Sequence, residues 1–255
     1  MRYVLGVYLP GFILGGISLA WLIHLGLWPV LILTWALVSG LGVAVGFHRV
    51  YSHATHKEIR PWLDNLLLLL GTLGGQGSSI SWVAVHRGYH HKYSDTERDL
   101  HSPVHGFWSA FIGWYWKLTP DTINHKYAVD LLRRRNHVFL HKHYINFLWV
   151  FCLVLGLISL KLLAVYAATL FISLCQDNGV NTICHTRKLG YKNYPTTDNS
   201  VNFAPLGYLG WGQGWHENHH AEPATFSFGR RWWELDPCVL WLPFLGLGSV
   251  RNANS

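Results

Sequence analysis

The chain has 255 residues, of which 50% are hydrophobic and 13% are charged, whereas about a quarter of the residues in an average soluble domain are charged. This composition indicates a membrane protein and excludes a disordered or fibrous chain. The formal net charge is +7. Because the chain is apolar and contains 14 Trp residues, nucleic acid is a poor partner. The basic excess points instead to an anionic lipid surface or a phosphate-bearing substrate.

The first long apolar stretch covers residues 3–47, which contain no Asp, Glu, Lys or Arg. It is more than twice as long as the roughly 20 residues that cross a bilayer core. As one helix it would extend about 68 Å, roughly twice the thickness of that core. We therefore predict two membrane spans, near residues 11–27 and 30–47, with the turn at Trp28 and Pro29.

A second uncharged stretch, residues 65–85, is long enough to cross a membrane once. It contains four glycines and Gln76, and histidine clusters flank it on both sides. A single crossing would place these clusters on opposite faces of the membrane, where they could not share a site. We therefore predict that residues 61–85 form an interfacial or re-entrant segment.

Two further spans are predicted near residues 143–160 and 162–180, with a turn near Lys161. The basic run at residues 133–135 favours a cytoplasmic position for the segment that precedes them. Lys and Arg residues also flank the histidine clusters, whereas the opposite ends of the spans carry little more than Lys161. The histidine clusters are therefore expected on the cytoplasmic side.

The predicted fold is a single all-α domain over residues 1–255, an integral, multi-pass membrane protein with four transmembrane helices. Both termini are expected on the cytoplasmic side. A cytoplasmic helical cap, formed by residues 86–142 and 186–255, is expected to hold a histidine-rich site for two metal ions.

The 17 histidines outnumber the 13 acidic residues, and eight of them fall in three clusters. These clusters are His48 and His53; His86, His90 and His91; and His216, His219 and His220. Residues three or four apart share one face of an α-helix, whereas neighbours and residues five apart diverge by about 100° or more. The members of each of the last two clusters can therefore converge from a single turn, and the diverging pairs suit two neighbouring metals.

Metal coordination would satisfy imidazole nitrogens that would otherwise lack partners beside a bilayer. One zinc ion takes four ligands in all, so eight imidazoles indicate two ions. Imidazole suits iron, copper, zinc and nickel, so the ligand type by itself leaves the metal open.

These motifs resemble those of the membrane-bound fatty acid desaturases. Within that family they resemble the delta-nine type that acts on acyl-CoA or acyl-lipid substrates, the stearoyl-CoA desaturase-like type. The resemblance extends from Gly42 to about Pro237. It rests on three motifs that contain the histidine clusters, at residues 42–53, 82–95 and 212–220.

A fourth match is the pair Asn181 and His185, which lie one helical turn apart. The chain departs from the family pattern in two places. The second motif, His-x-x-x-His-His, is one residue longer than is usual in the acyl-CoA type. In the third motif, Glu217 stands where Asn is usual.

The resemblance implies a site with two iron ions (Fe2+/Fe3+) and nine histidine ligands. These ligands would be His48, His53, His86, His90, His91, His185, His216, His219 and His220, with Asn181 bound through water. It also implies O2-dependent desaturation of a long-chain fatty acyl group, in which two hydrogens leave adjacent carbons and a cis double bond forms. Electrons would come from a separate donor protein, a ferredoxin or a b-type cytochrome, since the sequence has no cysteine-rich cluster motif, haem signature or glycine-rich dinucleotide loop.

The acyl chain is expected to bind in an apolar tunnel that ends at the metals. Aromatic residues near the motifs are the candidates for its lining, namely Tyr51, Trp82, Tyr89, Trp211 and Trp215. Basic residues could hold a phosphate of the carrier headgroup, with Arg87, Lys92 and Lys188 as the candidates. Taken singly, each aromatic residue is by default an interfacial anchor or a core residue, and each basic residue is by default a solvated charge.

Other functions remain open at this point. A related di-iron membrane hydroxylase or carotenoid ketolase would share the histidine chemistry. A zinc protease could use His216, Glu217 and His220, which match His-Glu-x-x-His, but it would leave the remaining clustered histidines unexplained. A metal transporter would be expected to carry its ligands within the spans rather than at their cytoplasmic ends.

Overall fold

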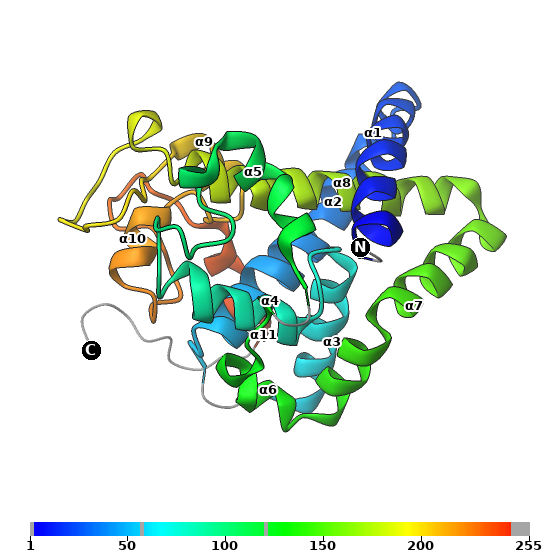
Figure 1. The fold of residues 1–255 in the computed structure, drawn as a ribbon. Coiled ribbons are helices and arrows are strands. Elements are labelled where there is room, and N and C mark those ends of the chain that lie inside the picture. The colour runs from blue at the N-terminus through cyan, green and yellow to red at the C-terminus, as the bar shows by residue number, and fades with distance from the viewer. Residues whose placement is uncertain (1–2, 57–58, 120–121, 246–255) are drawn as a thin grey trace.

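The computed structural model describes residues 3–56, 59–119 and 122–245. These residues form helices and loops, and no strand is found among them. The long helices extend from one side of the molecule, and the short helices gather around their other ends (Figure 1). The fold of the described residues is therefore all-helical, as predicted.

The first helical hairpin begins with η1 (Val4–Tyr8), which continues into α1 (Leu9–His24). Its second arm is α2 (Trp28–Trp35), which continues into η2 (Ala36–Ser52). The turn lies at Gly26, which has a φ of +71°, rather than at Trp28 and Pro29. Pro29 instead lies in the first turn of α2, where its missing N–H interrupts no helical hydrogen bond.

The second hairpin consists of α7 (Arg135–Ile158) and α8 (Leu160–Ile183). Ser159 separates them, and its hydroxyl oxygen accepts a hydrogen bond from the backbone N–H of Lys161 at 3.2 Å. The helix α7 begins eight residues before the predicted span, because the polar residues at its start continue the helix without a Pro or Gly. The structure thus contains four helices long and apolar enough to cross a membrane, namely Val4–His24, Trp28–Ser52, Arg135–Ile158 and Leu160–Ile183.

Large apolar side chains are exposed on the outer faces of α1, α2 and α7. For example, Ile17 is 65% exposed, Leu33 60% and Leu157 78%. Soluble proteins rarely expose so much contiguous apolar surface. The four helices are consistent with a membrane protein, whereas their insertion and the side on which the cap lies stay predictions.

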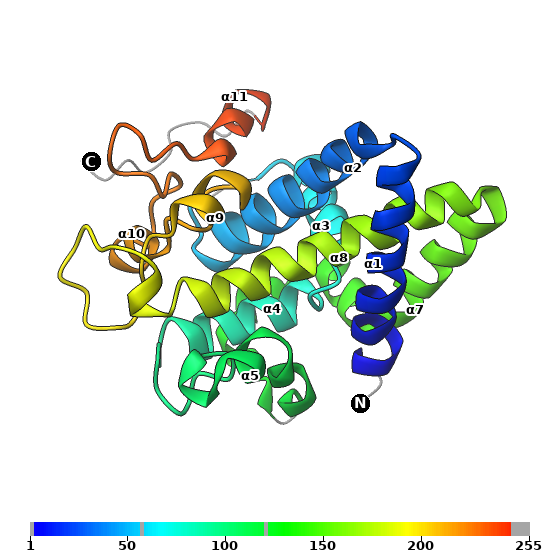
Figure 2. The ribbon, with the colours of Figure 1, turned by 90° about the horizontal axis from the view of Figure 1, so that it is seen from above.

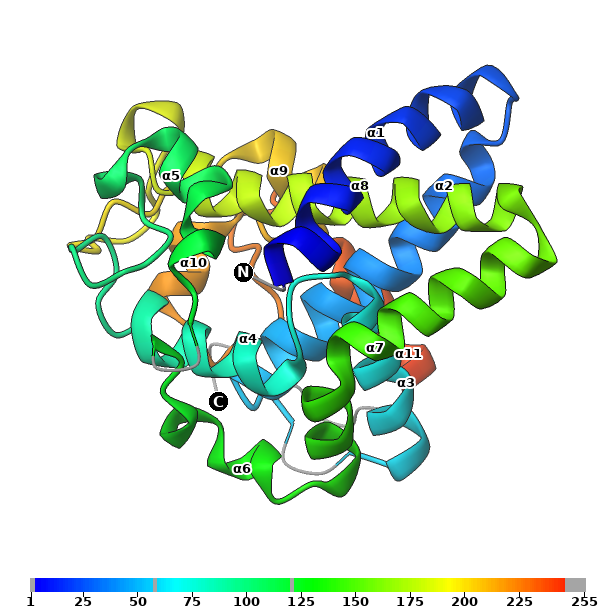
Figure 3. The same ribbon diagram turned by 45° about the vertical axis from the view of Figure 1, so that its right-hand side comes forward.

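Residues 61–85 form two short helices rather than one long one. These are α3 (Pro61–Leu73) and α4 (Ser79–Val85), which continues into η3 (His86–His90). They lie beside η2, the continuation of α2, in the view of Figure 3. The helix α3 packs so closely on η2 that a Cβ at Gly42 would lie 2.4 Å from the carbonyl carbon of Leu70. The break between α3 and α4 agrees with a segment that does not cross, although its depth in a membrane stays a prediction.

The remaining elements are short and gather around the ends of η2, α4 and α8, as Figure 2 shows from above. They are η4 (Pro103–His105), α5 (Phe107–Phe111), η5 (Gly113–Lys117), η7 (His125–Ala128), α6 (Val129–Leu132), η8 (Arg187–Leu189), α9 (Ala204–Leu209), α10 (His216–Ala221), η9 (Pro237–Trp241) and α11 (Leu242–Leu245).

A buried ion pair ties these short elements to the second long helix. Arg49 on η2 donates to a carboxylate oxygen of Asp236 at 2.8 Å, and both side chains are fully buried. The Arg49 guanidinium also lies 3.8 Å from the centroid of the Phe228 ring. A buried charge of this kind requires its partner, so the C-terminal segment has a fixed position beside His48.

Candidate metal centre and cavity

The helical turns that carry the first two histidine clusters have π-helical hydrogen bonding. The N–H of His53 donates to the carbonyl of His48 at 3.2 Å, and the N–H of His91 donates to that of His86 at 3.0 Å. Bonding from residue i to i+5 brings residues five apart onto one face. The prediction that His48 and His53 diverge was therefore wrong, and His86 shares its face with His91 rather than with His90.

Together with His185 just after α8 and the three histidines of α10, these turns form two adjacent groups of nine histidines in all. In each group, one ring nitrogen of every member lies within 4.8 Å of the others. The first group is His48, His53, His86, His91 and His219, and the second is His90, His185, His216 and His220. All nine predicted ligands are thus brought together, and neighbours such as His90 and His91 are divided between the groups as expected.

The nitrogens that converge are the Nε2 atoms. In the first group they lie 2.8 Å apart for His53 and His86, and 2.9 Å apart for His48 and His219. In the second group the separation is 2.9 Å for His185 and His216. Two nitrogens bound to one metal at right angles, each at about 2.1 Å, are about 3.0 Å apart. The two groups therefore fit two metal ions.

The opposite ring nitrogens of three of these histidines are held by carboxylate or amide side chains. Nδ1 of His185 donates to Asp95 at 3.0 Å, and Nδ1 of His220 donates to Asp198 at 2.8 Å. Nδ1 of His48 donates to the Gln213 side-chain oxygen at 2.6 Å. Bonds of this kind fix the tautomer that leaves Nε2 free for a metal. These three partners were not predicted from the sequence, although Asp95 and Gln213 lie within the matched motifs.

Most of these histidines are easier to deprotonate than an exposed imidazole. Burial lowers the pKa of His86, His91 and His219, and the neighbouring imidazoles lower it further. For His185, burial favours the neutral form, but the hydrogen bond to Asp95 and the negative charges of Asp95, Asp99 and Asp198 together outweigh it and raise the pKa. Neutral imidazole is the form that binds metal. Most of these histidines are therefore in the metal-binding form at neutral pH.

Asp99 and His101 extend the second group. Nδ1 of His101 lies 3.3 Å from one Asp99 oxygen, and Nδ1 of His90 lies 3.4 Å from the other. Asp99 and His101 are both buried. Neither residue was predicted to belong to the site, because their spacing in the chain matches no histidine motif.

Glu217 faces away from the histidines. Its carboxylate accepts hydrogen bonds from the backbone N–H groups of Asn193 and Tyr194 at 2.9 and 3.0 Å. It also accepts from the Asn202 side-chain amide at 3.3 Å. A fully buried carboxylate with these partners holds the loop before α9, and it is not aimed at a metal-bound water.

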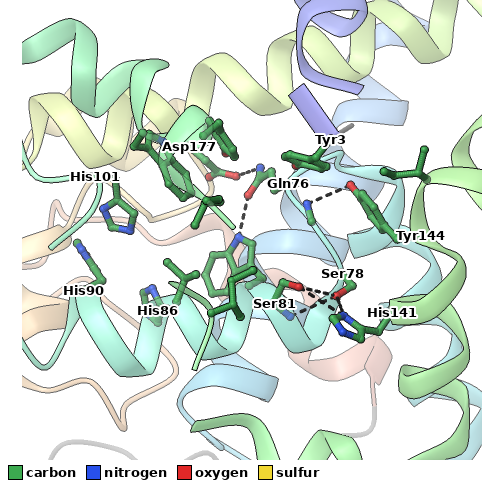
Figure 4. Close-up of a pocket in the computed structure, with 18 of the residues that line it drawn as sticks. Tyr3, Gln76, Ser78, Ser81, His86, His90, His101, His141, Tyr144 and Asp177 are labelled. Atoms are coloured by element: carbon green, nitrogen blue, oxygen red, sulfur yellow. Dashed lines mark hydrogen bonds between the residues drawn. The ribbon is translucent and has the colours of Figure 1, made fainter. Parts of the chain in front are cut away.

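A cavity of about 1070 Å³ begins at the two groups. His48, His86, His90 and His216 line it, and it extends past Trp82 to α7. Figure 4 shows His86, His90 and His101 at one end, and Tyr3, Tyr144 and His141 at the other.

The indole of Trp82 forms the wall of the cavity next to the first group. Its ring stacks on that of His86, with centroids 4.7 Å apart and an interplanar angle of 24°. Its Nε1 donates to the side-chain oxygen of Gln76 at 3.0 Å, and the Gln76 amide donates in turn to Asp177 (Figure 4). Asp177 on α8 therefore holds the Trp82 indole in position through Gln76.

Asn181 also lines the cavity and lies on α8, one turn before His185. Its side chain is half-buried. Its predicted contact with a metal through water stays a prediction.

Trp82 lines the cavity, whereas the other candidate substrate-binding residues have partners elsewhere or are exposed. Tyr51 donates to the carbonyl of Asp64, Tyr89 to that of Thr122 and Trp215 to that of Leu235, and Trp211 packs against Trp35. Among the basic candidates, Arg87 pairs with Asp130, Lys92 donates to the Tyr127 hydroxyl, and Lys188 is exposed.

Comparison with known proteins identifies this arrangement. The family model for fatty acid desaturases matches residues 19–243, a range that contains all nine clustered histidines. The chain belongs to the fatty acid desaturase family. It is therefore an oxidoreductase that desaturates fatty acyl groups, and the zinc-protease and transporter hypotheses lose their support.

Several similar proteins are known. The sn-1 stearoyl-lipid 9-desaturase of Anabaena variabilis is 35% identical over 226 residues, which cover 86% of this chain and 81% of the relative. Delta-9 acyl-lipid desaturase 1 of Arabidopsis thaliana is 33% identical, and the match covers 83% of this chain and 71% of the relative. Icosanoyl-CoA 5-desaturase of Limnanthes douglasii is 31% identical, and the match covers 84% of this chain and 60% of the relative. The names of these relatives thus differ in acyl carrier and in double-bond position.

Proposed function

We propose that the chain inserts a cis double bond at the delta-nine position of a long acyl chain carried by a membrane lipid, using O2 and two iron ions. The names of the Anabaena and Arabidopsis relatives support the position and the carrier. The observation that carries the proposal is the pair of Nε2 groups at one end of a long cavity.

The proposed ligands of one iron are the five histidines of the first group. Those of the other iron are the four of the second group, with Asn181 bound through water. When bound, the two irons and O2 supply the oxidising power for C–H cleavage that side chains lack. The chain supplies neutral imidazoles and holds three of them at fixed tautomers through Asp95, Asp198 and Gln213.

The cavity would hold the acyl chain against the ligands and exclude water from it. Trp82 is proposed to set where the chain passes the first group, since it touches a ligand on one side and lines the cavity on the other. Gln76 would keep the indole in place through its bond to Nε1. The carbon that is oxidised would then depend on how far the chain can extend beyond this point.

We also propose that the cap lies on the cytoplasmic side, with the donor, a ferredoxin or a b-type cytochrome, bound to it. The two chain ends, predicted on the same side, lie outside the described residues. Arg187 and Lys188 are exposed just after the ligand His185. Electron donors of these types tend to be acidic, so a cationic surface near the metals would favour their approach.

The test is the fatty-acid profile of a host that expresses the chain, with position of the double bond determined by mass spectrometry. We expect new delta-nine monoenes with the wild type and none with His220→Ala. His24→Ala, which changes an exposed histidine outside both groups, is the matched control. An iron-loaded wild type that produces no new double bond would contradict the proposal.

A further inference from the structure

We infer that the substrate acyl chain enters the cavity sideways from the bilayer, between η1 and α7, while it is still esterified to a membrane glycerolipid. This inference rests on the proposed function and specifies how its substrate arrives. We refer to the gap between η1 and α7 as the portal.

The portal lies at the end of the cavity far from the histidines. Leu5 and Gly6 of η1 line the cavity there, as do Asn146 and Trp149 of α7. Both helices belong to the set long and apolar enough to cross a membrane. A cavity that reaches the surface between two such helices can open directly into the bilayer.

The lining residues at the portal are exposed on the outside of the molecule as well. Leu5 is 57% exposed and Trp149 is 54% exposed. By contrast, Trp114 and His90, which line the cavity deeper inside, are buried. The cavity is therefore open at the side where the apolar helices face outward.

Gly6 lines the portal but contributes no side chain to it. A Cβ at this position would meet Nε1 of Trp149 at 3.5 Å and Cγ2 of Ile145 at 3.7 Å. These are ordinary contact distances, so one methyl group fits, whereas the rest of a large side chain would have to occupy the space between the helices. Gly6 is thus the position at which the portal can be closed by one substitution.

The polarity of the rim fits an amphiphile that lies across the membrane boundary. Leu5, Ile145 and Trp149 provide apolar contact, and exposed Lys142 and His143 lie on α7 toward the cap. Lys142 and His143 also border a shallow hollow with Arg133 and Arg135. A lipid with its chain in the portal would therefore have its headgroup beside cationic side chains, as at a membrane surface.

The proposed test compares two acyl carriers and three variants. Iron-loaded wild-type protein with its electron donor is supplied either with vesicles of 1-stearoyl-2-oleoyl phosphatidylglycerol or with soluble stearoyl-CoA. Gly6→Trp is expected to reduce double-bond formation on the vesicle lipid at least tenfold, with iron content unchanged. Ile13→Trp is the control, since it changes an exposed residue of α1 that does not line the cavity, and it should stay within twofold of the wild type. Gly6→Ala adds only a methyl group at the portal and should reduce activity less than Gly6→Trp does.

A second readout does not depend on catalysis. Vesicle lipid with a diazirine near the end of its stearoyl chain is photolysed, and the cross-linked peptides are mapped. In the wild type we expect cross-links to cavity residues such as Val85 and Trp114, together with cross-links to exposed residues of α7 such as Leu157. Gly6→Trp should remove the first set and keep the second.

The outcomes separate the inference from the proposed function. Full activity of Gly6→Trp on vesicle lipid, or cavity cross-links that persist in this variant, would overturn the portal. A wild type that acts on stearoyl-CoA and not on the lipid would overturn it too. A wild type that forms no double bond on either carrier would contradict the proposed function, and the cross-links would still decide whether the portal admits lipid.

Discussion

Asp95 accepts a hydrogen bond from Nδ1 of His185 at 3.0 Å and joins the second histidine motif to the end of α8. The same carboxylate accepts from the backbone N–H of Asn199 at 2.7 Å. The second histidine motif therefore meets the end of α8 and the loop that follows it at one side chain, and the orientation of the His185 ring depends on it.

Removing this carboxylate should weaken metal binding without removing a ligand. We expect Asp95→Asn, and likewise Asp198→Asn at His220, to reduce iron affinity about 10- to 100-fold. Iron retention against increasing chelator measures this effect. Asp130→Asn is the control, because Asp130 pairs with Arg87 at the surface. Equal retention in Asp95→Asn, Asp198→Asn and wild type would show that these carboxylates do not support the metals.

Each histidine group should lose its own metal. His53→Ala and His185→Ala alter different groups, so each is expected to lower the iron content from about two per chain toward one and to abolish desaturation. Metal analysis of the purified variants, together with the fatty-acid profile, checks this expectation. A fully active His185→Ala enzyme with both irons would contradict the assignment of His185.

Glu217→Ala separates a structural role from a catalytic one. The substitution leaves the part-buried N–H groups of Asn193 and Tyr194 without their acceptor. A fully buried donor left unpaired costs about 1–3 kcal/mol, so each of these groups should cost less than that. We expect a lower unfolding temperature with most of the iron retained. Glu217→Gln should be intermediate, since the amide oxygen can still accept one of these bonds. A variant with unchanged stability and no activity would favour the catalytic role instead.

The iron-free protein should lose stability as the pH falls. His101 illustrates the sign: burial lowers its pKa to about 4, against about 6.5 in the unfolded chain. The folded state therefore binds fewer protons than the unfolded state between these values, and stability falls with pH across this window. The buried His86, His91 and His219 act in the same direction, whereas His185 acts in the opposite one.

Unfolding temperatures of the iron-free protein at pH 7.5 and pH 5 test this expectation. We expect a lower value at pH 5, and a smaller drop in His101→Gln, which cannot take up the proton. His24→Gln, at an exposed position, should behave like the wild type. A protein that is more stable at pH 5 than at pH 7.5 would contradict the sign of the effect.

Features that depend on local sequence could be predicted. The four apolar helices follow from runs of uncharged residues, and the break between α3 and α4 follows from glycines such as Gly75 and Gly77, which have φ values of +72° and +100°. The grouping of nine histidines could be anticipated from the motifs. Its division into five and four could not, because α-helical geometry was assumed for turns that are π-helical.

The extra residue in the second motif illustrates this limit. A π-helical turn holds one residue more than an α-helical turn, so the inserted residue is absorbed while His86 and His91 stay on one face. The roles of Asp198 and Gln213 also depended on tertiary contacts. So did the position of the cavity opening, since η1 and α7 are more than 100 residues apart in the chain.

The buried pair of Arg49 and Asp236 has a consequence for shortening the protein. Gln213 accepts from both the Arg49 guanidinium and Nδ1 of His48, so a truncation that removes Asp236 would leave an uncompensated cation beside a proposed iron ligand. Breaking a buried pair in this way typically costs about 3–5 kcal/mol. A purification tag or a fusion partner should therefore be attached after residue 245, and the segment that contains Asp236 should be kept in every shortened version.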